Sequence, residues 1–238
     1  GEGARTRVVV VRLDPARVRL ALDTLMAERR MPDGARLREP RWTLDAAPRR
    51  ALVAVNAGQF AEDLFGARPF GWTVLAGREW QAPGSGALAS AVVIDGAGRV
   101  RIEPAAALAS PARARGVAWA FQSYPALLEG DGDVPPMLRA GDAIDRTHRD
   151  ARLAIGTLRD GRVVLALTRF DALGPALGAL PLGLTTPETA ALMGALGCDR
   201  AVMLDGGISA QLQLRDGGTV RRWRGWRAVP MGLVVFAR

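Results

Sequence analysis

Residues 201–212, AVMLDGGISAQL, join a short apolar run to a carboxylate and a glycine turn. A run of this kind is typical of a buried strand, and it brings Asp205 to the strand end. Gly206 and Gly207 allow backbone conformations that other residues avoid and let a ligand approach the main chain. Successive amides in such a turn can form an anion-binding concavity, and Ser209 adds a hydroxyl. The same pattern fits an ordinary Asp-Gly hairpin turn, so both interpretations stay open.

Asn56 ends a second apolar run, LVAVNAGQF at residues 52–60, and is the only asparagine in the chain. Its amide offers two donors and an acceptor, so it can hold a sugar hydroxyl or a phosphoryl oxygen without charge. The simpler interpretation is an asparagine that favours a turn. Because the composition avoids asparagine, its survival at a strand end favours a chemical role.

A cluster of basic residues precedes a third apolar run in RTHRDARLAIG, residues 146–156. Arg152 starts the expected strand, so its guanidinium is the one we expect to be oriented, as a clamp for phosphate. Arg146 and His148 lie upstream, and the histidine titrates near neutral pH. Solvated surface side chains are the simpler interpretation for this cluster.

Composition narrows the class of protein. The chain has 238 residues, no lysine, one cysteine and a formal net charge of +8 that comes from arginine. Arginine-rich surfaces suit anionic partners, although replacement of lysine by arginine across a solvated surface explains the charge equally well. A single cysteine excludes an internal disulfide and a cysteine-based zinc site. The sequence contains no GxxxxGK[ST], HExxH or GxSxG motif.

The pattern of short strands predicts one α+β domain with mixed or antiparallel sheets and a few packed helices. Residues 1–49 are expected to add strands and a helix to a core formed by residues 50–238. Hairpins are predicted in 94–102 and 151–168, and a capped helix in 185–197. We also expect helices in 23–31 and 43–51, and loops in 31–41 and 130–151.

Four stretches in order resemble the phosphodiester glycosidase family. AVNAGQF resembles its Asn-Gly-Gly-Phe motif, and AFQSYPALLEGD resembles Gln-Ser-Gly-Pro-x-Leu. ARLAIGTLRDGRVVLALT resembles its Arg-Thr-Ala-Ile-Gly hairpin. GLTTPETAALMGALGCDRAVMLDGGISAQL resembles a Gly-Leu-Thr helix followed by Leu-Asp-Gly-Gly-x-Ser.

The chain departs from the family at several motif positions. Asn56 is followed by Ala57-Gly58 and then Gln59, so the second motif glycine is displaced. Tyr124 stands where glycine is usual, and Leu153 replaces threonine. His148 is farther from the strand arginine than in the family's His-Pro-Arg.

The resemblance implies a hydrolase that cleaves a sugar-1-phosphodiester in a cell-envelope or exopolysaccharide glycan. The implied catalytic residues are Asp205, Asn56 and Arg152. The expected substrate-binding residues are Gln122, Gly206, Gly207, Ser209, Arg146 and His148. A phosphate leaving group lowers the need for acid assistance, and the sequence does not reveal a second carboxylate. Glu188 is one candidate and is equally a helix cap.

Other functions remain open at this stage. A non-catalytic binder of anionic glycan would use the arginine surface with Trp223 and Trp226. Single-stranded nucleic-acid binding is a weaker alternative, and nucleic acid is not the expected partner. No cofactor is evident, and a divalent metal stays open. No apolar run reaches membrane-spanning length. We expect an exported protein, periplasmic or extracellular, whose signal segment is absent from this sequence.

Overall fold

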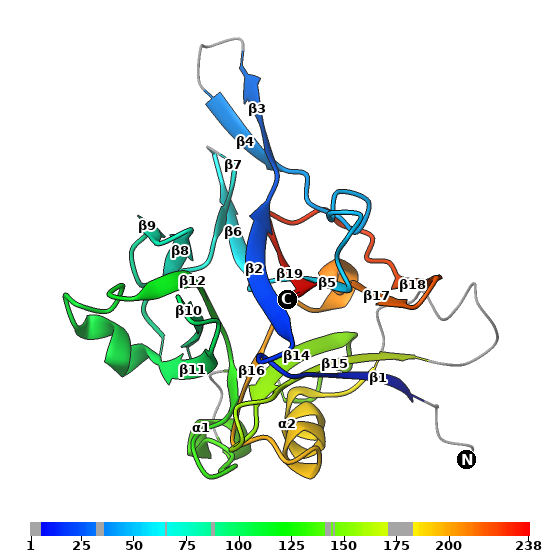
Figure 1. Ribbon diagram of the computed structural model, residues 1–238. Helices are drawn as coiled ribbons and strands as arrows, with labels where there is room; N and C mark the ends of the chain where they lie inside the picture. Colours follow the sequence, from blue (N-terminus) through cyan, green and yellow to red (C-terminus); the bar gives the residue numbers. More distant parts are fainter. Residues whose placement is uncertain are drawn as a thin grey trace.

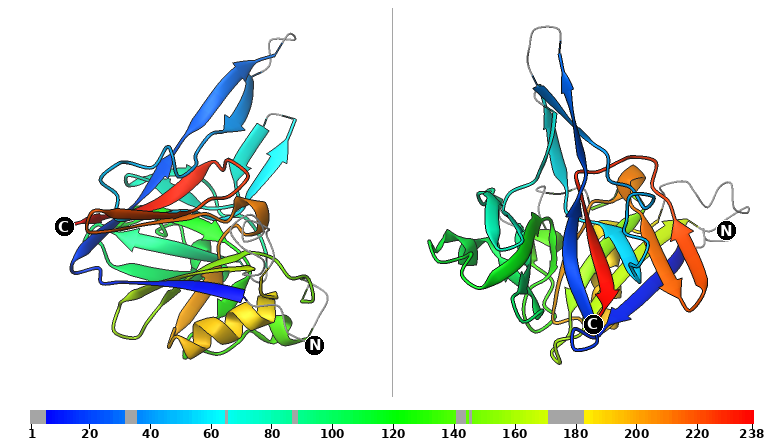
Figure 2. Two further views of the ribbon diagram at one scale, coloured as in Figure 1. Left: turned by 90° about the vertical axis from the view of Figure 1, so that its right-hand side faces the viewer. Right: turned by 45° about the horizontal axis from the view of Figure 1, so that its top comes forward.

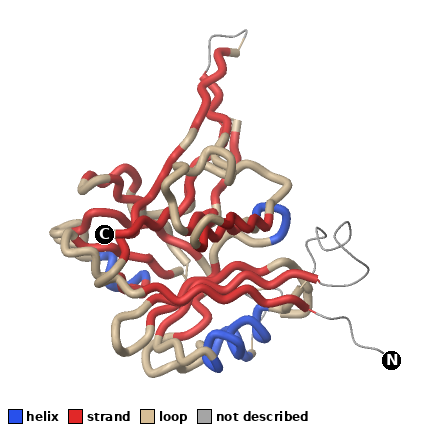
Figure 3. Tube along the Cα trace, turned by 45° about the vertical axis from the view of Figure 1, so that its right-hand side comes forward, coloured by secondary structure: helices blue, strands red, loops and turns tan. Residues whose placement is uncertain are grey.

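β-branched and alternating runs form strands along most of the chain. The computed structural model describes residues 6–31, 36–64, 66–86, 89–140, 144, 146–170 and 183–238. Within them the protein is predominantly β, with two α-helices, α1 (Pro136–Arg139) and α2 (Thr186–Ala195) (Figure 3). The expectation of an α+β domain is corrected in this respect, because two of the expected helices form other structures.

Three five-stranded sheets and one four-stranded sheet make up the fold (Figure 1). The first sheet has the order β1 (Thr6–Leu13), β15 (Val163–Phe170), β14 (Arg152–Thr157), β16 (Arg200–Met203) and β13 (Ala126–Leu128). The second has the order β11 (Val100–Pro104), β10 (Ser90–Asp95), β12 (Val117–Ser123), β8 (Thr73–Leu75) and β9 (Arg78–Gln81). The third has the order β18 (Thr219–Trp223), β17 (Leu212–Asp216), β5 (Val53–Asn56), β19 (Met231–Ala237) and β2 (Val18–Thr24).

The fourth sheet forms an arm that extends away from the other three (Figure 2). Its order is β3 (Met26–Arg30), β4 (Arg36–Pro40), β7 (Gly66–Pro69) and β6 (Phe60–Asp63). The contact between β4 and β7 is parallel, through Arg38 and Gly66, whereas the neighbouring strands of the three larger sheets pair antiparallel. The expected mixed and antiparallel sheets are thus confirmed.

One hydrophobic core joins the three larger sheets. It draws apolar side chains from all of them, among them Leu20 and Val55 of the third sheet, Val92 and Phe121 of the second, and Leu165 of the first. These side chains are almost completely removed from water. Because the same core is shared, the three sheets fix each other's strand ends, and the connections between sheets are held at the rim of this core.

The outer faces of the sheets have separate covers. Helices α1 and α2 pack on the first sheet with Leu138 and Met193. Trp42 covers the third sheet, and the short 3₁₀ helix η1 (Ala105–Ala109) contributes Leu108 to a cluster on the second. A Cβ on Gly232 would lie 1.9 Å from the Trp42 ring, so this strand position has room for glycine alone.

Elements with strong local signals form as expected. Helix α2 carries the predicted capping box between Thr185 and Glu188, and Gly197 follows it with a φ of +84°. The hairpins β10–β11 and β14–β15 have antiparallel registers. Residues 1–49 contribute strands as expected, and β1 and β2 flank Asp14, but they pair with β15 and β19 and not with each other.

Four local expectations are wrong. Residues 26–30 form β3, and 36–40 form β4, where we expected a helix and a loop. Opposite charges face each other across this ladder, as in Glu28 and Arg38, so strand pairing outweighs local helix propensity. Residues 43–51 form turns because Pro48 interrupts the helical pattern and has no amide to donate. The expected loop at 130–151 contains α1 and is described only in part.

Candidate active site

Asp205 lies on a connection that crosses between two sheets. Strand β16 of the first sheet ends at Met203, and β17 of the third sheet begins at Leu212. The amide of Leu204 donates to the Leu153 carbonyl (2.7 Å), and the amide of Asp205 donates to the Ala57 carbonyl (3.1 Å). The connection therefore touches β14 on one side and the residue after β5 on the other.

Asn56 clamps both ends of this connection. Its Nδ2 donates to the carbonyl of Asp205 (2.7 Å), and its Oδ1 accepts from the amide of Gln211 (2.9 Å). The side chain is completely buried. The amide is thus committed to the backbone of the Asp205–Gln211 segment, where it sets the shape of the segment that carries the carboxylate.

The two motif glycines bring this segment close to the start of β14. A Cβ on Gly206 would lie 2.8 Å from the Ala151 carbonyl oxygen, and one on Gly207 would lie 2.8 Å from Oδ2 of Asp150. Gly207 also has a φ of +58°, which glycine tolerates best. Its amide donates to the Ala151 carbonyl (2.8 Å), so this amide is engaged within the protein.

Burial controls the charge of Asp205. It raises the pKa of this carboxyl group to about 6, and the nearby charge of Asp150 adds to the increase. Hydrogen bonds from the Ser209 hydroxyl and the Gly206 amide, and the charge of Arg227, act in the opposite direction. Among the described residues, the buried Oδ2 of Asp205 has no hydrogen-bond partner. A buried carboxylate oxygen without a partner requires an explanation, and its raised pKa makes Asp205 a functional-site candidate.

Asp150 is a second carboxylate beside this segment, and our sequence interpretation missed it. Its Oδ1 accepts from the Ala151 amide (2.8 Å), and its Oδ2 lies 3.8 Å from Nε2 of His148. Burial raises its pKa, against the Ala151 amide and the charges of Arg152 and His148. The signal available in the sequence was its place two residues before Arg152, at the strand start.

Arg152 lies at the start of β14 with a half-buried side chain. Its Nε donates to the Leu184 carbonyl (2.9 Å), and one terminal nitrogen donates to the His148 carbonyl (2.7 Å). These bonds orient the guanidinium, as the sequence led us to expect. Arg146 instead donates to the carbonyl of Arg139, the last residue of α1 (2.8 Å). The His148 side chain is 64% exposed.

Gln122 is buried and holds the segment around residues 71–84. Its Oε1 accepts from the amides of Trp72 (2.9 Å) and Gly84 (2.8 Å), and its Nε2 donates to the Gly84 carbonyl (3.0 Å). Gly58 fits tightly beside it, because a Cβ there would lie 2.5 Å from the Gln122 carbonyl oxygen. Gln122 therefore holds backbone groups of residues 72 and 84 in place, as Asn56 holds those of residues 205 and 211.

Gln59 connects the second motif to the carboxylate segment. Its Oε1 accepts from the Ser123 hydroxyl (2.7 Å) and the Tyr124 amide (3.1 Å), and its Nε2 donates to the carbonyls of Tyr124 and Leu204. The Tyr124 ring is 41% exposed and stacks at a tilt on Phe70, with 5.0 Å between ring centres. Gln59, which follows the displaced motif glycine, thus joins residues 123 and 124 to Leu204 by hydrogen bonds.

Arg227 is a further cation near Asp205 that our site assignment did not include. Its guanidinium pairs with Glu62 and lies over the Phe60 ring, 4.8 Å from the ring centre. The preceding residue, Trp226, donates its amide to the Ile208 carbonyl (2.7 Å). Trp226 is 59% exposed and Ile208 is 45% exposed, so apolar surface adjoins the carboxylate segment.

A buried arginine holds the far end of the same segment. Arg169 of β15 donates to the carbonyls of Ala210 and Arg224. Burial lowers its pKa. The bonds tie the carboxylate segment to the turn that carries Trp226 and Arg227, so these two regions are positioned together.

One candidate from the sequence, Glu188, has a structural role, and the expectations about metals and cofactors stay predictions. Glu188 completes the α2 cap and pairs with Arg149 (2.6 Å), so it serves as a helix cap and not as the second carboxylate. Across the described ranges, no cluster of three or more His, Cys, Asp or Glu side chains is arranged to hold a metal ion. The expectation of no cofactor remains a prediction.

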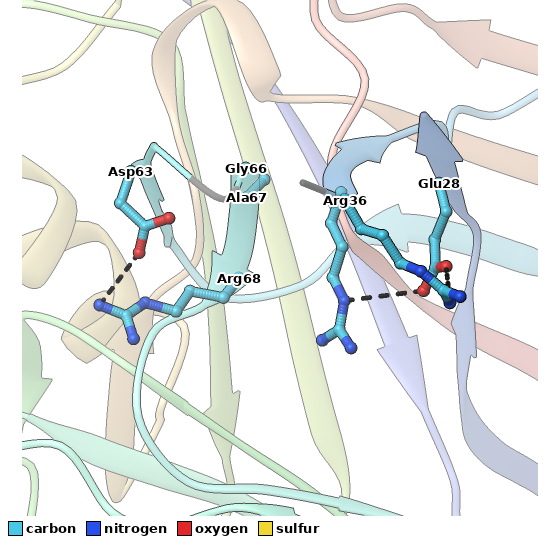
Figure 4. Close-up of a pocket in the computed structure, with 7 residues that line it drawn as sticks. Glu28, Arg36, Asp63, Gly66, Ala67 and Arg68 are labelled. Carbon is cyan, nitrogen blue, oxygen red and sulfur yellow. Dashed lines mark hydrogen bonds and ion pairs between the residues drawn. The ribbon is translucent and has the colours of Figure 1, made fainter. Parts of the chain in front are cut away.

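A hollow of about 380 Å³ lies on the arm, apart from these residues (Figure 4). Charged side chains of β3, β4, β6 and β7 line it. Its arginines face carboxylates, as in the pairs Arg36–Glu28 (3.3 Å) and Arg68–Asp63 (3.4 Å). Since these arginines are already paired with carboxylates, we place the candidate active site at the ends of β5, β14 and β16 and not on the arm.

The fold and the site define a predominantly β protein with a buried carboxylate on a glycine-rich crossing between sheets. The phosphodiester glycosidase family matches residues 49–236, and the chain belongs to this family. The match covers the four motifs named above. None of the curated proteins matches the sequence.

Solved structures share the fold at low sequence identity. The catalytic domain of zebrafish N-acetylglucosamine-1-phosphodiester alpha-N-acetylglucosaminidase, auto-inhibited by its pro-peptide, has a TM-score of 0.61 and 16% identity, over 100% of this chain and 90% of that one. A hypothetical protein from Synechocystis has a TM-score of 0.62 and 18% identity, over 100% and 60% of the two chains. A putative exported protein from Burkholderia pseudomallei has a TM-score of 0.58 and 19% identity, over 96% and 73%.

Proposed function

We propose that the protein is a hydrolase that cleaves a sugar-1-phosphodiester. The observation that carries this proposal is the buried, unpartnered Oδ2 of Asp205 in a chain of the phosphodiester glycosidase family. The strand ends bring Asp205 together with Asp150, Arg152 and Arg227. Carboxylates beside cations suit a substrate that carries a phosphate next to an electron-poor anomeric carbon.

Asp205 is the principal catalytic carboxylate in this proposal. At neutral pH a carboxyl group with a pKa of about 6 is mostly ionised. It then acts as a nucleophile or stabilises an oxocarbenium-like state. Its buried oxygen has no hydrogen-bond partner among the described residues, so a substrate group that bound there would replace no existing bond.

Arg152 and Arg227 are the cations proposed to receive the phosphate. A guanidinium matches phosphate oxygens with two parallel donors. The charge of Arg152 acts on Asp150 and that of Arg227 acts on Asp205, so each cation lies near one carboxylate. Asn56 and Gln122 are proposed to position the site, because their amides bind backbone groups.

The proposed substrate is a glycan of the cell envelope or an exopolysaccharide, and the proposed location is outside the cytoplasm. A net charge of +8 favours such anionic polymers. One structural neighbour carries the description of an exported protein, which supports this location. In the part of the chain that the structure describes, helices long and apolar enough to span a membrane are absent.

The direct test is a panel of sugar-1-phosphodiesters, including nucleotide sugars and glycan phosphates, with detection of released sugar and phosphate monoester. We expect turnover by the native chain and loss of about 100-fold or more in kcat for Asp205→Ala. Arg152→Ala should raise KM and lower kcat, with Arg152→Lys retaining part of the activity. Circular dichroism checks that both variants fold, and full turnover by Asp205→Ala would refute the assignment.

A non-catalytic binder of anionic glycan is the second candidate. The observation in its favour is the exposed Trp226 next to Ile208 and the carboxylate segment. A binder would retain glycan in a pull-down without releasing sugar, and its affinity would fall with added salt. Turnover in the panel would exclude this candidate as the main function.

A further inference from the structure

Gly207 lies against the carboxyl group of Asp150 and two residues after Asp205. It has no side chain, and a Cβ in its place would lie 2.8 Å from Oδ2 of Asp150. Asp205 precedes it by two residues in the same segment. Burial is the main cause of the raised pKa of Asp205, and the charge of Asp150 makes a smaller contribution in the same direction. The two carboxylates therefore flank one short glycine segment.

Asp150 is also held in place by its own surroundings. Its backbone forms a bridge with Leu184, and its Oδ1 accepts from the Ala151 amide (2.8 Å). Its Oδ2 is the oxygen that faces Gly207. The side chain is 22% exposed, so it keeps some contact with water. A fixed carboxylate with limited access to water suits proton transfer.

We propose that Asp150 is the second carboxyl group of the reaction, acting as the base that takes the proton of the attacking water. This inference rests on the proposed function and assigns the role that Glu188 does not fill. The capped helix position of Glu188 and its pair with Arg149 explain that side chain fully.

The proposed step is a displacement at the anomeric carbon of the sugar. The water oxygen bonds to the anomeric carbon, and the bond between that carbon and its leaving oxygen breaks. The bonding electron pair goes to the leaving oxygen, and the proton of water passes to the Asp150 carboxylate. The carboxyl group then returns this proton to solvent, so the enzyme is regenerated without a further reactant.

The charges around the pair explain why it can work near neutral pH. Asp150 is faced by Arg152 of β14, by His148 and by Asp205. Asp205 is faced by Arg227 and by the Ser209 hydroxyl. Two nearby carboxylates ionise in coupled steps, so the second proton leaves at higher pH. The base is therefore stronger than an isolated, solvated aspartate.

The test compares Asp150→Asn with Glu188→Gln as a matched control that removes a carboxylate outside the site. On a sugar-1-phosphodiester, Asp150→Asn should lower kcat by about 100-fold or more and change KM by less than about 3-fold. Asp150→Glu should recover part of the rate. The acidic limb of the pH–rate profile should move to lower pH in Asp150→Asn, because Asp205 loses its like-charged neighbour.

A second readout does not depend on turnover. Carbon-13 NMR of labelled aspartate carboxyl groups follows Asp205 directly, and its apparent pKa should fall in Asp150→Asn and stay unchanged in Glu188→Gln. An unchanged Asp205 titration, or a kcat within about 3-fold of the native value, would overturn the role of Asp150. If the native chain hydrolyses nothing in the panel, the proposed function fails, and the titration alone decides whether the pair exists.

Discussion

At Asn56, one buried amide determines where a charged residue 149 positions later in the chain can lie. Its donor and acceptor bind the Asp205 carbonyl and the Gln211 amide, which belong to the two ends of one crossing segment. Alanine would leave both backbone groups buried without a partner. Asn56 is thus best described as a positioning residue that acts through the backbone of Asp205.

We expect Asn56→Ala to lower the free energy of unfolding by about 2–3 kcal/mol, because two buried hydrogen bonds are lost. The kcat should fall more than KM rises, since the carboxylate moves while the cations stay. Urea unfolding and steady-state kinetics measure both effects. Unchanged stability together with a large rise in KM would instead indicate direct contact between Asn56 and the substrate.

We expect the ionisation of Asp205 to lower the free energy of unfolding as the pH rises. Its folded-state pKa of about 6 lies above the value of 3.8 for a free carboxyl group, so the folded state holds the proton more tightly. The ionised form therefore destabilises the fold from about pH 4 upward, with the full effect above pH 6. Each pKa unit corresponds to about 1.4 kcal/mol.

We therefore expect Asp205→Asn to be more stable than the native protein by roughly 1–3 kcal/mol at pH 8. The difference should disappear below about pH 4, where both forms are neutral. Urea denaturation at a series of pH values follows it. The burial argument would be contradicted if the variant's advantage in free energy of unfolding over the native protein were smaller at pH 8 than at pH 4.

At the scale of elements, the glycine crossing between β16 and β17 depends on close backbone approach. Gly207 combines a φ of +58° with a Cβ position against Asp150. Gly218, in the β17–β18 turn, has open space around it. A substitution at Gly207 therefore combines crowding in the site with backbone strain, and one at Gly218 causes neither.

We expect Gly207→Ala to lower kcat by at least about 10-fold, because the new methyl group displaces the Asp150 carboxylate. It should also lower the free energy of unfolding by about 1 kcal/mol or more. Gly218→Ala should leave kcat unchanged. Kinetics and urea unfolding of both variants test this expectation, and equal effects of the two substitutions would disprove it.

Sequence patterns predict elements whose signals are local. The α2 helix has its cap in adjacent residues, and the β14–β15 hairpin has an Asp-Gly turn. The β3–β4 pair was missed because its stabilising contacts, such as Arg29 with Glu39, join residues that local helix propensity does not connect. Motif resemblance indicated Asn56, Arg152 and Asp205, but no local pattern shows which groups an amide binds.

The position of Asp150 beside the glycine segment is likewise not evident from its local sequence, although it stands two residues before Arg152. It lies in a charged stretch that is typical of a solvated loop, and only the folded chain brings Gly207 against it. Arg227 likewise follows an exposed tryptophan in the sequence, and only the fold brings its charge near enough to lower the pKa of Asp205. Contacts between strand ends depend on sheet order, which a single sequence does not specify.

In the molecule as a whole, three sheets share one core, and the candidate site lies where segments of the first and third sheets come together. The chain as a whole carries a formal net charge of +8. For an anionic substrate, the field of this charge should raise the rate of encounter and be screened by salt.

We expect kcat/KM for a sugar-1-phosphodiester to fall about 5- to 10-fold between 50 and 500 mM salt, with little change in kcat. Steady-state kinetics in sodium chloride and in choline chloride separate screening from binding of a particular ion. A constant kcat/KM over this range would show that the arginines are only a solvated surface.

We propose above all that Asp205 performs phosphodiester cleavage in this chain. The most direct measurement is release of sugar and phosphate monoester from a sugar-1-phosphodiester by the native protein and by folded Asp205→Asn. The account predicts turnover by the native protein and a loss of about 100-fold or more in the variant. Equal turnover by both proteins, or no turnover by the native one across the panel, would contradict it.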